Sequence, residues 1–172
     1  MTRLRLVPPL PEKGSEESAP ETPRLQKFLP NGMRVPGIYG VLQGEWFWAN
    51  FWGHGRLRLY TPTEESPGEG WQPSDEVDGA GRPLSWHLMV TKSDLYRLVD
   101  VSLLTTWRKF DLGIHGYIDG TVYAFVGASP KIDQIRRGEI AEITIAGPGE
   151  YHGRFRWEDL SDLVLTEQDL LR

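Results

Sequence analysis

The pattern of hydrophobic and polar positions predicts a three-stranded antiparallel meander over residues 38–60. Five aromatic rings crowd into one strand-length segment, at Trp46, Phe47, Trp48, Phe51 and Trp52. Neighbouring side chains of a strand point to opposite faces, so the three tryptophans share one face. A strand this apolar on both faces is either enclosed in the protein or exposes one aromatic face to a partner.

Turn residues on both sides of this strand set the register. Gln43-Gly44 predicts a two-residue turn to the preceding strand, and Gly53-His54-Gly55 closes a hairpin to the following one. Trp48 then lies between Tyr39 and Tyr60. The face that needs no water is a predicted core face, formed by Ile38, Leu42, Phe47, Ala49, Phe51, Leu57 and Leu59.

The opposite face, which we call the tryptophan face, mixes aromatic rings with two arginines. Its predicted members are Tyr39, Val41, Trp46, Trp48, Asn50, Trp52, Arg56, Arg58 and Tyr60. Two interpretations stay open. The arginine side chains simply cover the rings, or the face is a recognition surface, because tryptophan, tyrosine and arginine dominate binding hot spots.

The rest of the chain predicts further short strands and two or three short helices. Strands are expected at residues 84–90, 101–107, 111–118, 121–126, 140–146 and 151–157, with a strand or helix at 163–170. Helices are expected from Thr91-Lys92-Ser93-Asp94 to about residue 98, after Ser129-Pro130, and as one turn at Glu158-Asp159-Leu160. The predicted fold class is α+β: a mainly antiparallel β-sheet with two or three short helices in a single domain.

Two segments rich in proline and acidic residues stand apart from these elements. Residues 1–30 contain six of the thirteen prolines and four glutamates, which predicts a disordered Pro/Glu-rich tail, with Leu25, Phe28 and Leu29 as a candidate docking patch. Residues 31–172 form the predicted single α+β domain. Residues 61–83 are expected to be a long loop, which Trp71 attaches to the body of the domain.

Composition narrows the function classes. The chain has 172 residues, a net charge of −5 and no cysteine, so disulfides and cysteine-ligated metal centres are excluded. The acidic balance argues against a nucleic-acid partner. Neither a membrane span nor a secretory signal is evident, so the expected location is the cytoplasm, with no membrane partner.

Catalytic motifs are scarce, and we nominate no catalytic residue, no metal ligand and no cofactor. The histidines, His54, His87, His115 and His152, are widely spaced, and the chain has no nucleophile elbow and no phosphate-binding glycine loop. Glu45 beside the tryptophans lacks a second carboxylate at a defined distance. Enzymatic activity is therefore disfavoured, although a site assembled in three dimensions, joining a histidine to a carboxylate in a deep pocket, stays open.

The C-terminal segment is acidic and adds three candidate partner-binding residues, Glu158, Asp159 and Asp162. Such a run is either a solvated face or a docking surface for a basic partner.

Several features in sequence resemble small immunity proteins of bacterial polymorphic toxin systems. These are the tryptophan-rich hairpin, the segment Ser85-Trp86-His87-Leu88-Met89-Val90-Thr91-Lys92-Ser93-Asp94-Leu95, the Asp119-Gly120 hairpin, and Gly153-Arg154-Phe155-Arg156-Trp157-Glu158-Asp159-Leu160 followed by Glu167 and Leu170. The resemblance implies a cytoplasmic inhibitor that binds a basic toxin domain and occludes its active site. The alternatives are a ligand- or carbohydrate-binding β module with a tryptophan stacking face, and the spatially assembled enzyme.

Overall fold

Strands paired in antiparallel fashion make up most of the computed structural model, which describes residues 26–127 and 131–171. The strands are β1 (Gly37–Leu42), β2 (Glu45–Phe51), β3 (Arg56–Thr61), β4 (Gln72–Pro73), β5 (Trp86–Thr91), β6 (Arg97–Trp107), β7 (Phe110–Ile118), β8 (Thr121–Val126), β9 (Ile143–Gly147), β10 (Glu150–Arg156) and β11 (Ser161–Asp169). The helix α1 spans Ile132–Arg136, and two 3₁₀ turns span Lys92–Asp94 and Trp157–Asp159.

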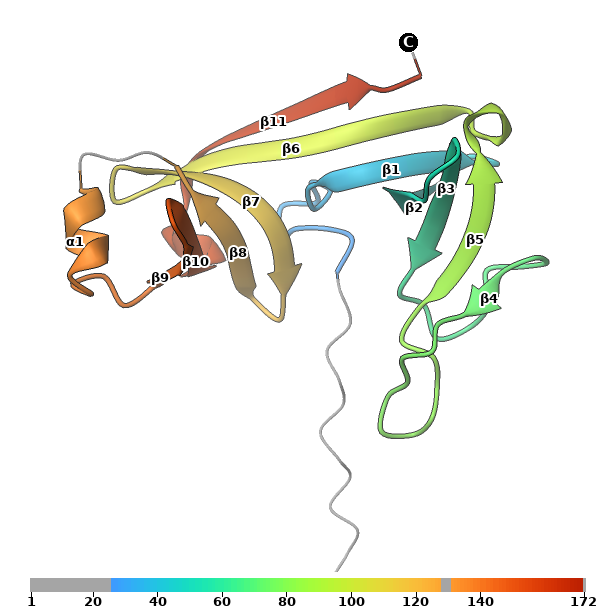
Figure 1. The fold of residues 1–172 in the computed structure, drawn as a ribbon, viewed down its shortest axis with the longest axis horizontal. Helices are drawn as coiled ribbons and strands as arrows, with labels where there is room; N and C mark the ends of the chain where they lie inside the picture. Colours follow the sequence, from blue (N-terminus) through green and yellow to red (C-terminus); the bar gives the residue numbers. More distant parts are fainter. Residues whose placement is uncertain (1–25, 128–130, 172) are drawn as a thin grey trace, which may run out of the picture.

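The long strand β6 is the common element of the sheet. Residues 97–101 of β6 pair with β1, and residues 103–107 pair with β7. On its other edge, β11 pairs with β6 from Val99 to Thr106. Two limbs therefore descend from the β6–β11 ribbon, as Figure 1 shows: a first limb in the order β1-β2-β3-β5-β4 and a second limb in the order β7-β8-β10-β9.

The predicted register of the meander is confirmed. Trp48 pairs with Tyr39 on one side and with Tyr60 on the other. Gln43 and Gly44 both have positive φ, at 53° and 87°. A two-residue turn of this kind has a twist that matches the flanking strands, so it fixes which residues face each other.

The predicted α+β class is wrong, because the described residues contain a single short helix and two isolated 3₁₀ turns in a mostly antiparallel β-sheet. The helix expected after Thr91 stops after one turn, since the chain from Arg97 onward pairs with β1. Tertiary pairing overrides the local capping signal there. The single turn expected at Glu158-Asp159-Leu160 forms as the 3₁₀ turn Trp157–Asp159, which leads directly into β11. The helix expected after Ser129-Pro130 forms as α1, although those two residues lie outside the described part of the chain.

Each limb has its own hydrophobic core. The first limb encloses Ala49, Leu57, Leu59, Trp71, Val90, Leu95 and Leu98. The second encloses Trp107, Phe110, Leu112, Ala124, Val126, Ile135, Ile143, Tyr151 and Phe155. The predicted core face is wrong at Phe51. Its side chain points to the expected side but is 56% exposed, because Phe51 lies at the end of β2, where no other element covers it.

A small hairpin at residues 27–35 lies between the limbs, and we call it the wedge. Its backbone closes through hydrogen bonds from the Val35 amide to the Lys27 carbonyl and from the Leu29 amide to the Met33 carbonyl. Leu29 and Val35 are buried together with Leu103 of β6, and Ile114 and Val122 of the second limb complete this cluster.

The wedge also contacts the first limb. The Lys27 ammonium is 5.4 Å from the Phe47 ring, and the Arg34 guanidinium is 4.1 Å from the Trp46 ring. Part of the segment that the sequence predicts as tail is therefore packed between the two limbs. Leu29 is buried and Phe28 is about half exposed, while Leu25 and the rest of residues 1–25 lie outside the described residues.

Candidate functional site

The tryptophan face is core at one end. Tyr39 and Trp48 are buried beside Val99 and Val101 of β6, and their rings stack at 5.9 Å. Trp46 and Tyr60 are partly buried against the same cluster. The wedge covers this end, and the Tyr39 hydroxyl donates a hydrogen bond to the Val35 carbonyl at 2.5 Å. Desolvation accordingly raises the pKa of Tyr39 above its usual value.

The other end of the same face is surface. Trp52 is 49% exposed, and the Arg58 guanidinium carbon lies 3.5 Å from the centre of its ring. Across the strands, Arg58 pairs with Asn50 on β2 and with Met89 on β5, and Met89 is also exposed. One end of the tryptophan face is therefore enclosed, and the other end is exposed, with Arg58 covering one side of the Trp52 ring.

The Arg58 side chain lies against the Trp52 ring. Among the described residues, its Nε atom is buried and has no hydrogen-bond partner, and the side chain forms no ion pair. Stacking on Trp52 fixes the plane of the guanidinium, whose N–H donors lie in that plane. The Arg58 donors are thus oriented before any ligand arrives.

A hollow of about 360 Å³ adjoins Arg58 on the first limb. It is lined by Asn50, Arg58, Tyr60, Ser74, Asp75, Glu76, Ser85 and His87. The strands contribute Arg58, Tyr60 and His87, whereas the loop before β5 contributes the two carboxylates. The hollow therefore offers both a cation and acids to a partner.

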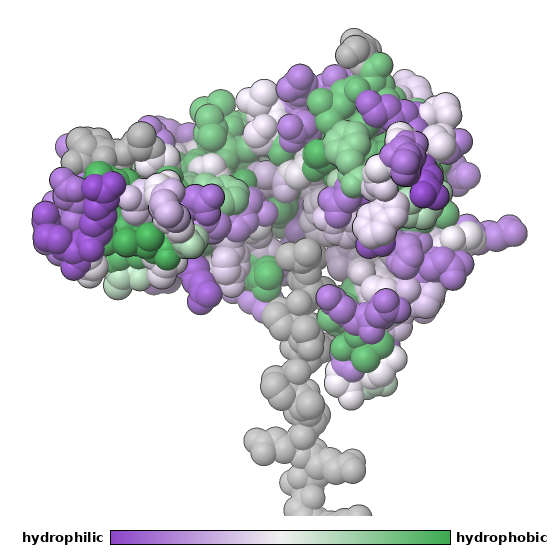
Figure 2. Space-filling view, in the orientation of Figure 1, coloured by the Kyte–Doolittle hydropathy of each residue, from purple (hydrophilic) through white to green (hydrophobic). Residues whose placement is uncertain are grey.

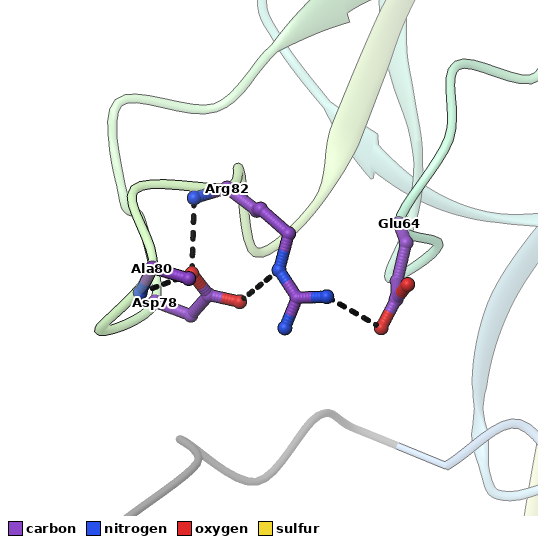
Figure 3. A network of polar contacts seen from close by, with 4 residues as sticks. All are labelled: Glu64, Asp78, Ala80 and Arg82. Atoms are coloured by element: carbon purple, nitrogen blue, oxygen red, sulfur yellow. Dashed lines mark hydrogen bonds and ion pairs between the residues drawn. The ribbon is translucent and has the colours of Figure 1, made fainter. Parts of the chain in front are cut away.

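The loop that walls this hollow is ordered by Asp78, a buried carboxylate. Asp78 accepts hydrogen bonds from the Ala80 and Arg82 amides and from Arg82 Nε, all within 2.9 Å, and Arg82 also reaches Glu64 at 3.4 Å (Figure 3). The Arg82 amide is the largest of the causes that lower the pKa of Asp78. Trp71 attaches the loop to the first limb as predicted. Its side chain is buried, and the centres of the Trp71 and Phe47 rings are 4.8 Å apart.

The acidic candidates lie elsewhere. Glu158 and Asp159 belong to the 3₁₀ turn before β11, and Asp162 accepts a hydrogen bond from the Thr106 hydroxyl at the second-limb end of the ribbon. Glu158 is already 3.9 Å from Arg156. The structure therefore does not join these three acids with Trp52 and Arg58 in one surface. Arg56, at the tip of the β2–β3 hairpin, is exposed near Trp52.

The sequence interpretation missed the part of the site that β5 and the loop contribute. His87 and Met89 alternate with core residues on β5, so their shared face was readable in the segment itself. Their position beside Tyr60 and Arg58 depends on β5 pairing with β3 across a loop of more than twenty residues. Local pattern carries no signal for that pairing.

Exposed apolar residues occur in other places as well. Figure 2 shows hydrophobic residues as separate patches on a largely polar surface. On the β6–β11 ribbon, Leu104 and Val164 pair with each other and are 58% and 56% exposed. This pair includes no aromatic ring and no arginine, so it lacks the residue types of a binding hot spot.

A second hollow, of about 480 Å³, lies on the second limb and brings His115 and His152 near Glu142. Both hollows thus place a histidine near a carboxylate, as the enzyme alternative requires. Among the described residues, no group of three or more histidine, aspartate or glutamate side chains is arranged to hold a metal ion, and no helix is long and apolar enough to cross a membrane.

No protein-family model matches this chain, and no curated protein or solved structure is significantly similar to it.

Proposed function

We propose that this protein binds another protein through the exposed end of the tryptophan face, and that it acts there as an immunity-type inhibitor of a toxin domain in the cytoplasm. The observation that carries the proposal is the Trp52–Arg58 stack beside an open hollow. A half-exposed tryptophan holds an arginine at 3.5 Å, and the arginine has no ion pair among the described residues.

Such a stack suits protein recognition because its binding groups are ordered in advance. An exposed arginine normally loses side-chain freedom on binding, which costs roughly 0.5–1.5 kcal/mol of affinity. Stacking on Trp52 and burial of Nε restrict Arg58 beforehand. Its remaining donors suit a carboxylate or a main-chain carbonyl of the partner.

The loop acids suit the basic partner that the resemblance implies. Asp75 and Glu76 line the same hollow as Arg58, and the chain carries a net charge of −5. Opposed charges of this kind accelerate encounter with a basic domain and select it against acidic ones. In this proposal Arg58 and Trp52 supply affinity, and the acids supply steering.

The rings of the tryptophan face are less suited to sugar stacking. A stacking platform needs an open ring face, yet the Arg58 guanidinium occupies one face of Trp52. Trp48 is buried, with Tyr39 and Tyr60 stacked on it at 5.9 and 5.6 Å. A protein partner, which can contact arginine and tryptophan together, fits this surface better.

Two adjacent aromatic residues provide a matched test. Trp52 and Phe51 are about equally exposed, at 49% and 56%, but point to opposite faces of the sheet. The partner is captured with the full chain from the source cells, purified, and titrated calorimetrically against the Trp52→Ala and Phe51→Ala variants. We expect Trp52→Ala to weaken binding by about thirtyfold, the effect of losing roughly 2 kcal/mol, and Phe51→Ala to change it by less than about threefold.

Equal affinities for both variants would reject the proposed surface. The inhibitor role has a separate readout: expression of the captured partner alone should arrest bacterial growth, and co-expression of this chain should restore it. Rescue by the wild-type chain and loss of rescue with Trp52→Ala support the role. A partner that is harmless when expressed alone contradicts it.

A further inference from the structure

The outer face of the second limb carries a set of polar side chains that the proposed function does not use. In β8 and β10, alternate residues fill the core, including Val122, Ala124 and Phe155. The residues between them face outward. Strand pairing sets Arg154 beside Tyr123, and His152 beside both Phe125 and Thr144.

A β-bulge in β7 adds a second histidine to this face. Ile114 pairs with Ala124 and Gly116 with Tyr123, so His115 is the extra residue between them. A bulge redirects the side chain of its extra residue. The His115 ring lies 4.4 Å from Phe125, which in turn is 4.6 Å from the His152 ring.

These side chains line the hollow of about 480 Å³ on the second limb. The groups that face it from each surrounding element are His115 of β7, Tyr123 of β8, His152 and Arg154 of β10, Thr144 of β9 and Glu142 before β9. Glu142 is 3.7 Å from the Arg108 guanidinium, which offsets its charge. The hollow is therefore rich in donors, and Arg154 supplies a fixed positive charge, in a chain whose net charge is −5.

We propose that this hollow binds a small molecule through a phosphate group, which His115, His152 and Arg154 would contact. A phosphate monoester has three terminal oxygens and up to two negative charges, so it suits several donors that converge from neighbouring strands. The volume exceeds what a bare ion fills and lies in the usual range for small-molecule sites, about 300–1,000 Å³.

The two histidines make this binding depend on pH. Their ring centres are 5.8 Å apart, and burial together with the neighbouring His152 lowers the pKa of His115. Protonated imidazoles this close repel each other, and a phosphate beside both removes the repulsion. Binding should therefore raise the pKa of the His115 imidazole. The phosphate gains its second charge at about pH 6, so the affinity should fall above about pH 7, where the phosphate is already a dianion and His115 loses its proton.

The experiment uses the full chain and follows its histidine side-chain signals by NMR during titration with inorganic phosphate, adenosine monophosphate or adenosine. We expect saturable changes in the chemical shifts of His115 and His152 with both phosphate-containing probes, a rise of about one unit in the pKa of His115, and no change in the signals of His54 or His87. Adenosine should bind at least tenfold more weakly than its monophosphate.

Two arginines on the same strand separate recognition from general charge. Arg154 lines the hollow, whereas Arg156, two residues along, does not, and both are exposed. Arg154→Gln should weaken monophosphate binding at least tenfold and Arg156→Gln less than twofold, with unchanged melting temperatures. Equal effects of the two variants, equal affinities for adenosine and its monophosphate, or no saturable shift would each overturn the proposal. Because the hollow and the Trp52–Arg58 stack lie on different limbs, failure here leaves the proposed function untouched.

Discussion

At the scale of single residues, Phe51 at the end of β2 and its neighbour Trp52 show that the face to which a side chain points and the burial of that side chain are separate questions. Phe51 and Trp52 point to opposite faces, as their positions in the sequence require, yet both are about half exposed. Leu57, which pairs with Phe51 on the same face, is fully buried. The position along the strand decides exposure here. Leu57 is covered because β3 also pairs with β5, whereas Phe51 is the last residue of β2, next to the hairpin.

This difference predicts the stability of two variants. Leu57→Ala should lower the free energy of unfolding by about 2–5 kcal/mol, since it leaves a cavity in the first-limb core. Phe51→Ala should lower it by less than about 1 kcal/mol, because its ring has little burial to lose. Urea unfolding of both variants measures the values. Similar losses at the two positions would show that Phe51 packs more closely than the structure indicates.

A hydroxyl group gives a second residue-scale prediction. Tyr39→Phe removes the donor to the Val35 carbonyl and leaves that acceptor unpaired in a buried site. We expect a loss of about 1–3 kcal/mol in the free energy of unfolding. Tyr96→Phe is the matched control, because Tyr96 is 82% exposed, and it should leave the free energy unchanged. If both variants have the free energy of unfolding of the wild type, this hydrogen bond does not stabilise the attachment of the wedge.

At the scale of elements, the segment before β5 is an ordered structure in its own right. Backbone hydrogen bonds join Ser74 to Ser85 and Asp78 to Arg82. The Asp78 carboxylate accepts hydrogen bonds from the Ala80 and Arg82 amides in the turn between Asp78 and Arg82. A long loop rich in proline, glycine and acid thus becomes a firm wall of the hollow beside Arg58. The ionised Asp78 carboxylate holds the turn at residues 78–82 of this segment.

Acid should therefore loosen this segment. Because the pKa of Asp78 is lower in the folded protein than in the unfolded chain, its stabilising effect is present above the unfolded value and is lost as the pH falls through the folded value. Hydrogen exchange of the Ala80 and Arg82 amides should accelerate, relative to other protected amides, as the pH drops below about 4. Asp78→Asn should show fast exchange of these amides already at neutral pH. If the Ala80 and Arg82 amides of the wild type exchange no faster in acid, or if Asp78→Asn leaves their exchange unchanged at neutral pH, the Asp78 carboxylate does not hold this turn.

At the scale of the whole molecule, β6 and the wedge make one unit of two limbs. β6 contributes Leu98 to the first-limb core and Trp107 to the second-limb core, and Leu103 between them meets Leu29 of the wedge. If β6 detaches from one limb, the core of the other limb also loses part of its packing. We therefore expect the limbs to unfold together.

Leu29 tests this coupling. Leu29→Ala should lower the free energy of unfolding by about 2–5 kcal/mol. It should also accelerate hydrogen exchange in both limbs, since the leucine packs where the limbs meet. Deletion of residues 1–25, whose proline- and glutamate-rich composition suits a tail, should leave the melting temperature nearly unchanged. Faster exchange confined to one limb would show that the limbs are independent.

Local structure was largely predictable from the sequence. Short turns such as Gln43-Gly44 and Asp119-Gly120 adopt positive φ that few residues tolerate, so they reveal hairpins and set the register of their strands. The parity of the tryptophans and the attachment of the loop by Trp71 follow from the same local rules. The error at this level was the helix after Thr91, which was expected to reach about residue 98 but stops after one turn, because the chain then enters β6.

What covers each face was decided only by the tertiary structure. Trp48 and Trp52 are equivalent in strand parity, yet the wedge and β6 bury the first, while the second remains at the surface beside Arg58. The pairing of β5 with β3 and the meeting of His115 with His152 likewise join residues far apart in the chain. Local pattern determines which way a side chain points. Burial and neighbourhood depend on long-range packing, and a single sequence holds no periodic signal for it.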